Sequence, residues 1–213
     1  MAGVQLVEMD PFTDERGGFA RAFDTTGFDE RGMQSTVAQC NVSWNHAAGT
    51  LRGFHLSLPG HPESKFIRCT RGAIVDVAVD VRPDSPTYLQ HVAVELSAEN
   101  RHALYLPPHL AHAYLTLTDD TEVLYMVSVP YAPGAEVGYR FDDPAFGVDW
   151  PREVSVISDK DAAWPAFGLA VAALLGVPRR PLDVGEPTKA VLLETPPLFR
   201  AVRVHIVEPG DRS

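Results

Sequence analysis

Residues Ala73-Ile-Val-Asp-Val-Ala-Val-Asp-Val81 alternate with a period of two, and this pattern gives the first indication of the fold class. Side chains on a β-strand point in turn to opposite faces, so the four valines share one face while Asp76 and Asp80 share the other with Ala78. His91 to Leu96 alternates in the same way. Two strands are therefore predicted here, one on each side of a Pro-containing turn.

Most of the remaining chain also predicts short strands. The sequence holds 18 Pro and 16 Gly along its whole length, which leaves little room for long helices. Short helices are expected at Thr25–Arg31 and Pro165–Leu175. At least eight short strands at close spacing predict an all-β fold of the jelly-roll barrel or sandwich type. The other expected strands are Ser35–Ser43, Thr50–Leu58, Lys65–Thr70, Ala103–Leu106, Ala113–Leu117 and Glu122–Val129.

The length of 213 residues suits one large domain, or a smaller domain with an appendage. The segment Pro178-Arg-Arg-Pro181 is typical of a linker. We therefore expect residues 1–177 to form the jelly-roll domain and residues 178–213 to form a C-terminal extension. Within that extension, Val191–Leu193 and Ala201–Val207 could each add a strand.

Charge and composition exclude several classes of partner. The chain has 18 basic and 28 acidic residues, a net charge of −10, whereas nucleic-acid and anionic-membrane binders need clustered Lys and Arg. Its longest apolar run, about Phe167 to Val177, is too short to span a bilayer, and the N-terminus does not resemble a signal peptide. Two cysteines exclude a disulfide scaffold. A cytoplasmic protein is expected.

Two neighbouring predicted strands carry residues suited to proton transfer. Arg52 and His55 lie within the first, and alternation in the second places Lys65 on the same face as Cys69, with Arg68 opposite. Lys and His facing into one barrel would make a cationic, protonatable pocket that needs an anionic ligand. The alternative is a surface His beside a surface Lys. Under the first interpretation, the acidic residues lie away from the pocket.

A metal site is the other interpretation of the histidines. Pro107-Pro-His-Leu-Ala-His112 resembles the second metal motif of cupins, and a site would need three or more converging ligands such as His109 and His112. The first motif is absent, because His55-Leu-Ser57 is followed by Lys65, and a cation repels a metal. We expect no metal, and we expect His112 to be a buried wall residue of a pocket.

Tyr125 and Asp161 each have a simple structural interpretation. Tyr125 shares a strand face with Val123 and Val127, where a Tyr commonly packs in the core. Asp161 follows Ser158 at the spacing of a helix entry, with Ser158 as a possible cap. Taken alone, neither residue indicates catalysis.

Together, these motifs resemble the dTDP-4-dehydrorhamnose 3,5-epimerase family from about Val4 to Gly168. The motifs that carry the resemblance, in chain order, include Asp14-Glu-Arg-Gly-Gly-Phe19, Gln39-Cys-Asn-Val-Ser43, Leu51-Arg-Gly-Phe-His55, Lys65-Phe-Ile-Arg-Cys69, Glu122-Val-Leu-Tyr125, Asp149-Trp-Pro151 and Ser158-Asp-Lys-Asp161. The resemblance implies a cupin-type jelly roll without metal or cofactor. It also implies a homodimer in which an N-terminal segment is exchanged into the partner's sheet.

The resemblance further implies a reaction and its residues. The substrate would be a nucleotide-diphospho-4-keto-6-deoxy-hexose, inverted at C3 and C5 by proton abstraction next to the C4 ketone. His55 would be the base, oriented by Asp161, with Lys65 facing the enolate oxygen and Tyr125 as the acid on the far face. The implied substrate-binding residues are Arg16, Gln39, Asn41 and Arg52 for the pyrophosphate and nucleoside, Phe19 and Tyr131 as aromatic walls, and His112 near the sugar.

Three departures from the family pattern keep other functions open. Leu56-Ser57 follow the base His where a Gln is common, Val129-Pro130 replace acidic, Asn or aromatic residues, and Arg21 stands where some members have an acid. The alternatives are an epimerase that acts only at C3 or only at C5, a non-catalytic sugar-nucleotide-binding cupin, and a metal cupin oxygenase.

Overall fold

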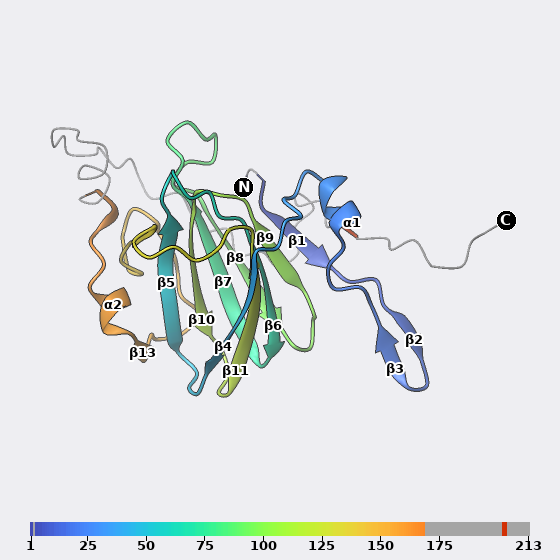
Figure 1. Cartoon of the computed structure of the whole chain (residues 1–213). Coiled ribbons are helices and arrows are strands. Elements are labelled where there is room, and N and C mark those ends of the chain that lie inside the picture. Colours follow the sequence, from blue (N-terminus) through green and yellow to red (C-terminus); the bar gives the residue numbers. More distant parts are fainter. Residues whose placement is uncertain (2, 169–201, 204–213) are drawn as a thin grey trace.

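The computed structural model describes residues 1, 3–168 and 202–203 and consists mostly of two sheets that face each other as a jelly-roll barrel (Figure 1). This arrangement confirms the predicted all-β fold. The first sheet has the strand order β14-β1-β9-β6-β11-β4. Its strands are β1 (Gln5–Glu8), β4 (Gln39–Asn45), β6 (Lys65–Arg71), β9 (Ala103–Leu106), β11 (Thr121–Val127) and β14 (Val202–Arg203).

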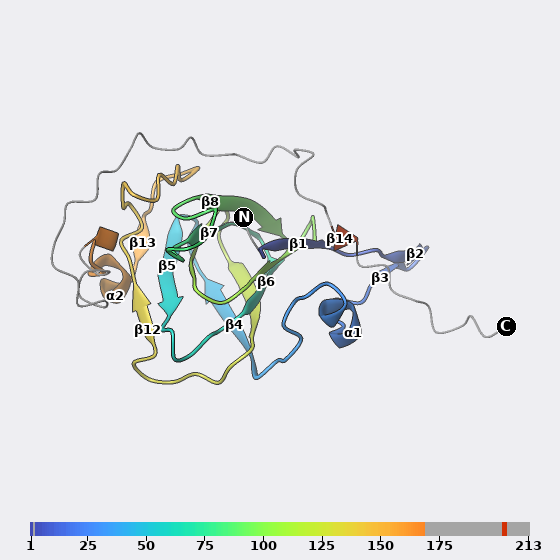
Figure 2. The same ribbon diagram turned by 90° about the horizontal axis from the view of Figure 1, so that it is seen from above.

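The second sheet has the order β12-β5-β10-β7-β8, and β13 pairs in parallel with β5. Viewed from above, the two sheets surround the barrel interior (Figure 2). A separate hairpin of β2 and β3 projects from the barrel (Figure 1). The bounds of these elements are β5 (Thr50–Ser57), β7 (Ala73–Asp80), β8 (His91–Ser97), β10 (Leu110–Thr116), β12 (Glu136–Gly138), β13 (Val156–Ile157), β2 (Phe12–Asp14) and β3 (Gly17–Phe19).

The helices are as short as expected. Helix α1 (Thr25–Asp29) matches the first predicted helix, and α2 (Asp159–Ala162) begins after Ser158, whose side chain accepts the backbone N–H of Asp161 as an N-cap. The second predicted helix lies mostly outside the described residues. None of the helices in the described part of the chain is both long and apolar enough to cross a bilayer.

The eight predicted strands are all present, with shifts at their ends. β4 begins at Gln39 rather than Ser35, and β10 begins at Leu110 rather than Ala113. β14 lies within the predicted strand Ala201–Val207. The other predicted strand of the extension, and the proposed boundary near residue 178, lie outside the described residues.

Strand β7 is buried on both faces. Ile74 and Ala78 pack into the core between the sheets, whereas Val77 and Val79 face outward into a second cluster. That outer cluster is aromatic: Phe146 packs edge-on against Phe54 at 5.2 Å between ring centroids. The valine face is therefore covered by the C-terminal part of the domain, and the aspartate face belongs to the barrel interior.

Candidate active site

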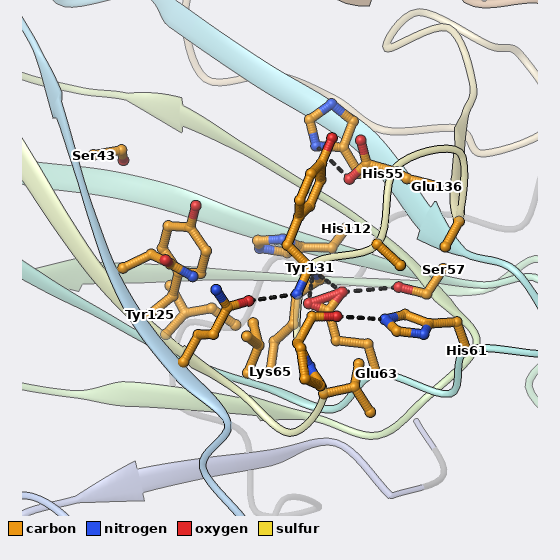
Figure 3. A pocket seen from close by; sticks show the side chains of 18 of the residues that line it. Ser43, His55, Ser57, His61, Glu63, Lys65, His112, Tyr125, Tyr131 and Glu136 are labelled. Atoms are coloured by element: carbon orange, nitrogen blue, oxygen red, sulfur yellow. Dashed lines mark hydrogen bonds and ion pairs between the residues drawn. The ribbon is translucent and has the colours of Figure 1, made fainter.

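A cavity of about 310 Å³ opens between the two sheets (Figure 3). A volume of this size suits a small-molecule ligand. Side chains from both sheets and from the segment after β11 form its walls. Those with chemical function are Gln39, Asn41, Ser43, Arg52, His55, Ser57, His61, Glu63, Lys65, His112, Tyr114, Tyr125, Tyr131 and Glu136.

An irregularity in β5 brings Arg52 and His55 to the same wall. In β10, His112 and Tyr114 are two residues apart, but they pair with His55 and Arg52, which are three apart. Gly53 lies inside this bulge with φ +121°, and a Cβ on it would lie 2.5 Å from both the Ala113 Cβ and the His112 carbonyl oxygen. The bulge thus reverses the alternation, so that both functional side chains face the cavity.

Asp161 holds the His55 ring from outside the cavity. Its Oδ1 lies 2.7 Å from His55 Nε2, Trp164 Nε1 donates to the same oxygen at 3.2 Å, and the Gly53 N–H donates to Oδ2 at 3.3 Å. Burial alone would raise the pKa of Asp161, but these hydrogen bonds outweigh it and lower the pKa below its usual value. Asp161 is therefore an anion that orients the imidazole through Nε2. The other ring nitrogen, Nδ1, makes no contact with Asp161.

Lys65 and Tyr125 lie on the other sheet. They come from the paired strands β6 and β11, in which Tyr125 opposes Ile67 and Val127 opposes Lys65. Burial raises the pKa of Tyr125, so its hydroxyl keeps its proton at neutral pH. The predicted base and the predicted acid thus lie on opposite walls of one cavity.

Four of the predicted binding residues, Gln39, Asn41, Arg52 and Tyr131, line the cavity. Gln39 and Asn41 are on β4, and the Gln39 side-chain oxygen accepts the Tyr131 backbone N–H at 2.5 Å. The Tyr131 ring is three-quarters exposed. Arg52 Nε donates to the Asn45 side-chain oxygen at 2.9 Å, which fixes its guanidinium beside the cavity.

His112 lines the cavity, as predicted, but it is partly rather than fully buried, with a side chain that is 12% exposed. Its Nε2 bonds Asp76 Oδ1, and the Asp76 side chain is fully buried. The other carboxylate oxygen of Asp76 has no hydrogen-bond partner in the described structure. The aspartate face of β7 therefore supplies the partner of a cavity histidine, a role that the alternation alone did not reveal.

The expectation that acidic residues lie away from the pocket is wrong. Both carboxylate oxygens of Glu63 lie 2.9 Å from Lys65 Nζ, and Ser57 Oγ donates to one of them at 2.8 Å. Glu136 also lines the cavity, with Oε1 3.6 Å from His55 Nδ1. The sequence reasoning missed both residues. The two-residue spacing of Glu63 and Lys65 is a signal for the first, whereas Glu136 follows a turn and has no periodic signal.

Two predicted binding residues lie outside this cavity. Arg16 and Phe19 are on the β2–β3 hairpin, where Arg16 pairs with Asp14 and Phe19 is 77% exposed. Neither residue contributes to the cavity walls. Within one chain, the structure therefore does not bring them together with His55.

No group of three or more His, Cys, Asp and Glu side chains is arranged to hold a metal ion in the described ranges 1, 3–168 and 202–203. His109, which the metal interpretation requires, is not among the cavity-lining residues, and His112 bonds Asp76. The geometry thus gives the metal interpretation no support.

Comparisons with known proteins show which family the chain is similar to. A family model described as dTDP-4-dehydrorhamnose 3,5-epimerase matches residues 1–168. An enzyme of that name from Sinorhizobium fredii is 41% identical over 168 residues, which are 78% of this chain and 86% of the relative. The crystal structure of the Bacillus anthracis enzyme with TDP and PPi bound has a TM-score of 0.75 at 35% identity, and the match covers 77% of this chain and 94% of that chain.

A further solved structure is similar to the same extent. The 3'-monoepimerase from Streptomyces bikiniensis in complex with dTDP-quinovose has a TM-score of 0.73 at 37% identity, and the match covers 82% of this chain and 87% of that chain. The residues that the family model matches include all of the cavity-lining residues described above. The chain therefore belongs to the dTDP-4-dehydrorhamnose 3,5-epimerase family.

Proposed function

We propose that this protein inverts C3, C5 or both in a nucleotide-diphospho-4-keto-6-deoxy-hexose. One observation carries the proposal: the Asp161-held His55 and the protonated Tyr125 lie on opposite walls of one cavity, with Lys65 beside them. Inversion at a carbon needs a base on one face and an acid on the other, which a single histidine does not supply. Membership of the epimerase family supports the same reaction.

The proposed reaction uses the acidity of hydrogens next to the C4 ketone. His55 removes the hydrogen from one neighbouring carbon, and Asp161 stabilises the imidazolium that forms. The negative charge moves to the C4 oxygen, where Lys65 stabilises it by an amount that mutagenesis of comparable sites places at about 3–4 kcal/mol. Tyr125 then delivers a proton to the opposite face of the carbon, which completes the inversion.

The nucleotide diphosphate is proposed to lie across the outer part of the cavity. Arg52 supplies a planar guanidinium suited to phosphate oxygens, and Gln39 and Asn41 present amides from β4. Tyr131, with its exposed ring, would stack against the base or sugar, and His112 would lie near the hexose. The TDP bound to the Bacillus anthracis relative supports a thymidine nucleotide.

Single epimerisation is the second candidate. The observation that favours it is the similarity to the Streptomyces bikiniensis 3'-monoepimerase, whose identity to this chain is close to that of the 3,5-epimerases. Leu56-Ser57 follow the base His where the family pattern commonly has a Gln, and Ser57 Oγ donates to Glu63. The side chains at the rim of the cavity therefore differ from those of the family pattern. The rim decides whether the ring turns over for a second proton removal.

We further propose that the protein acts as a homodimer in the cytoplasm. Val42 and Trp44 expose apolar side chains on the outer face of β4, and Phe12 and Phe19 do so on the hairpin. Such patches are typical of interfaces between subunits. Both cysteines are free thiols, which is compatible with a reducing compartment.

Solvent-isotope incorporation tests the function. In D₂O, NMR and mass spectrometry of dTDP-4-keto-6-deoxyglucose treated with the enzyme should show two incorporated deuterons for 3,5-epimerisation and one for single epimerisation. The His55→Asn variant, which keeps the size of the side chain but not its basicity, is the matched control. A panel of thymidine, cytidine and guanosine diphosphate 4-keto-sugars that shows no deuterium uptake contradicts the proposal.

A further inference from the structure

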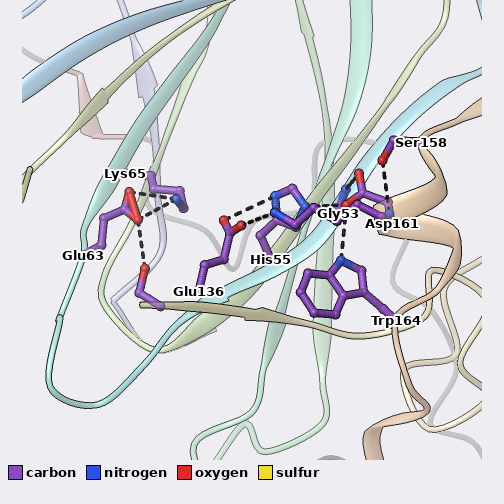
Figure 4. A network of polar contacts seen from close by, with 10 residues as sticks. Gly53, His55, Glu63, Lys65, Glu136, Ser158, Asp161 and Trp164 are labelled. Atoms are coloured by element: carbon purple, nitrogen blue, oxygen red, sulfur yellow. Dashed lines mark hydrogen bonds and ion pairs between the residues drawn. The ribbon is translucent and has the colours of Figure 1, made fainter. Parts of the chain in front are cut away.

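The side of His55 that Asp161 does not contact faces a second carboxylate. Glu136 Oε1 lies 3.6 Å from His55 Nδ1, and Figure 4 shows Glu136 and Asp161 on opposite sides of the imidazole. We propose that Glu136 is the proton outlet of the site: it takes the proton that His55 has removed from the sugar and passes it to water. This inference rests on the proposed epimerase function.

Each inversion leaves two groups of the site in the wrong protonation state. His55 holds the proton taken from the sugar, and Tyr125 has lost one, so both must be reset before the next removal. Asp161 is a poor route to solvent, because its side chain is only 6% exposed and its oxygens already accept bonds from His55, Gly53 and Trp164. The Glu136 side chain, in contrast, is 33% exposed and reaches solvent directly.

Two neighbours hold Glu136 beside the ring. Strand β12 pairs with β5 so that Glu136 opposes Ser57 and Gly138 opposes His55. Lys160 Nζ lies 2.7 Å from Glu136 Oε2, and this contact raises the pKa of Lys160. Lys160 therefore stays positively charged next to the Glu136 carboxylate. Lys160 also lies 5.4 Å from the Trp164 ring centroid. Oε2 is thus anchored, and Oε1 remains for His55.

Glu63, the other carboxylate of the cavity, does not suit this role. Both of its oxygens contact Lys65, and Ser57 donates to one of them. The proposed transfer is balanced: the imidazolium Nδ1–H bond breaks, an O–H bond forms at Glu136 Oε1, and His55 becomes neutral. Glu136 then releases the proton to water, and the Tyr125 phenolate takes one from solvent.

The test is the Glu136→Gln variant, whose amide oxygen still accepts from Lys160 but cannot carry the proton. We expect kcat to fall at least about tenfold, which is less than the 10²–10⁴-fold that a positioned acid or base typically contributes. In contrast, kcat/KM and the rate of the first turnover with excess enzyme should stay within about twofold. A 3,5-epimerase should then accumulate singly inverted sugar. Acetate or imidazole at constant ionic strength should restore kcat with increasing concentration.

Controls separate an outlet from a structural role. Glu95→Gln changes an exposed acid on β8 and should match the wild type, and Glu136→Asp should keep part of the activity. Losses in kcat/KM and in the first turnover that buffers do not restore would mean that Glu136 only positions His55, which overturns the proposal, as does an unchanged kcat. A wild-type enzyme inert towards nucleotide 4-keto-sugars contradicts the proposed function instead.

Discussion

At the scale of the residue, the hydroxyl of Tyr125 is the atom on which inversion depends. It lines the cavity and makes no hydrogen bond to another residue in the part of the chain that the structure describes, and burial raises its pKa. Tyr125→Phe should therefore lower epimerisation about 10²–10⁴-fold, because the acid is lost. Exchange of the substrate hydrogen with D₂O should persist, because His55 and Asp161 are unchanged. NMR that follows product and deuterium separately measures both effects.

The change should leave folding intact. Because the hydroxyl has no partner to lose, the free energy of unfolding in urea should differ from wild type by less than about 0.5 kcal/mol. Tyr88→Phe, which alters a half-buried Tyr outside the cavity, is the control for loss of a hydroxyl. If Tyr125→Phe epimerises at the wild-type rate, another group is the acid.

Residues that point into the barrel were predictable where alternation is regular. The facing of Lys65 and of Tyr125 follows from a period of two, and the motifs supplied their proposed roles. Glu63 was missed, although the same period places it beside Lys65. Glu136 was beyond reach of the sequence pattern, because a three-residue strand after a turn has too little alternation to define a face.

At the scale of the element, strand β5 shows the limit of alternation. A regular strand would place Arg52 and His55 on opposite faces, since their positions differ by three. The bulge at Gly53 corrects this, and it requires a residue that tolerates φ +121° and close contact with Ala113. The sequence contains the glycine, but only the pairing with β10 shows what it does.

Strand β4 shows a second limit, at its end. Residues 35–38 were predicted as strand, but β11 ends at Val127, which opposes Gln39. A strand continues only while a partner satisfies its backbone groups. The first residue of β4 is therefore set by where its neighbour β11 ends, which the local composition of residues 35–38 does not indicate.

The end of β7 makes folding sensitive to acid. Burial would raise the pKa of Asp80, but hydrogen bonds from Arg82, Ser85 and Thr87 outweigh it and lower the pKa well below its usual value of 3.8. A lowered folded-state pKa means that Asp80 stabilises the protein above about pH 3.8 and that this contribution is lost as the pH falls below it.

Asp80→Asn should accordingly destabilise the protein by about 2 kcal/mol at pH 7, because the charge-assisted hydrogen bonds are lost. The difference from wild type should shrink as the pH falls towards 3, because Asp80 of the unfolded chain becomes protonated there while folded Asp80 stays ionised. Urea unfolding at pH 7, 5 and 3.5 measures it, with the exposed Asp84→Asn as control. A difference that stays constant over this range argues against the ionised Asp80 as the source of the stability.

At the scale of the whole molecule, the proposed site is divided between two places in one chain. His55, Lys65 and Tyr125 surround the cavity, whereas Arg16 and Phe19 lie on a hairpin that projects from the barrel (Figure 1). Phe19, which is 77% exposed, opposes Phe12, which is 67% exposed, and such a patch of exposed apolar rings is typical of an interaction surface. We propose that a second copy of the chain covers this patch. That copy exposes Trp44 on the outer face of its own strand β4.

Subunit complementation decides whether the hairpin serves the partner's cavity. Arg16→Ala and His55→Asn should each inactivate a homodimer, since each removes a group from both sites. When the two variants are unfolded together and refolded as an equal mixture, half of the dimers are mixed, and each mixed dimer has one site with an intact His55 and an intact hairpin. Activity should therefore return to about a quarter of the wild-type value, as measured by product formation after light scattering has confirmed the dimer. Equal mixtures that stay inactive would show that Arg16 does not act in the partner's site, because a hairpin acting within its own chain restores nothing on mixing.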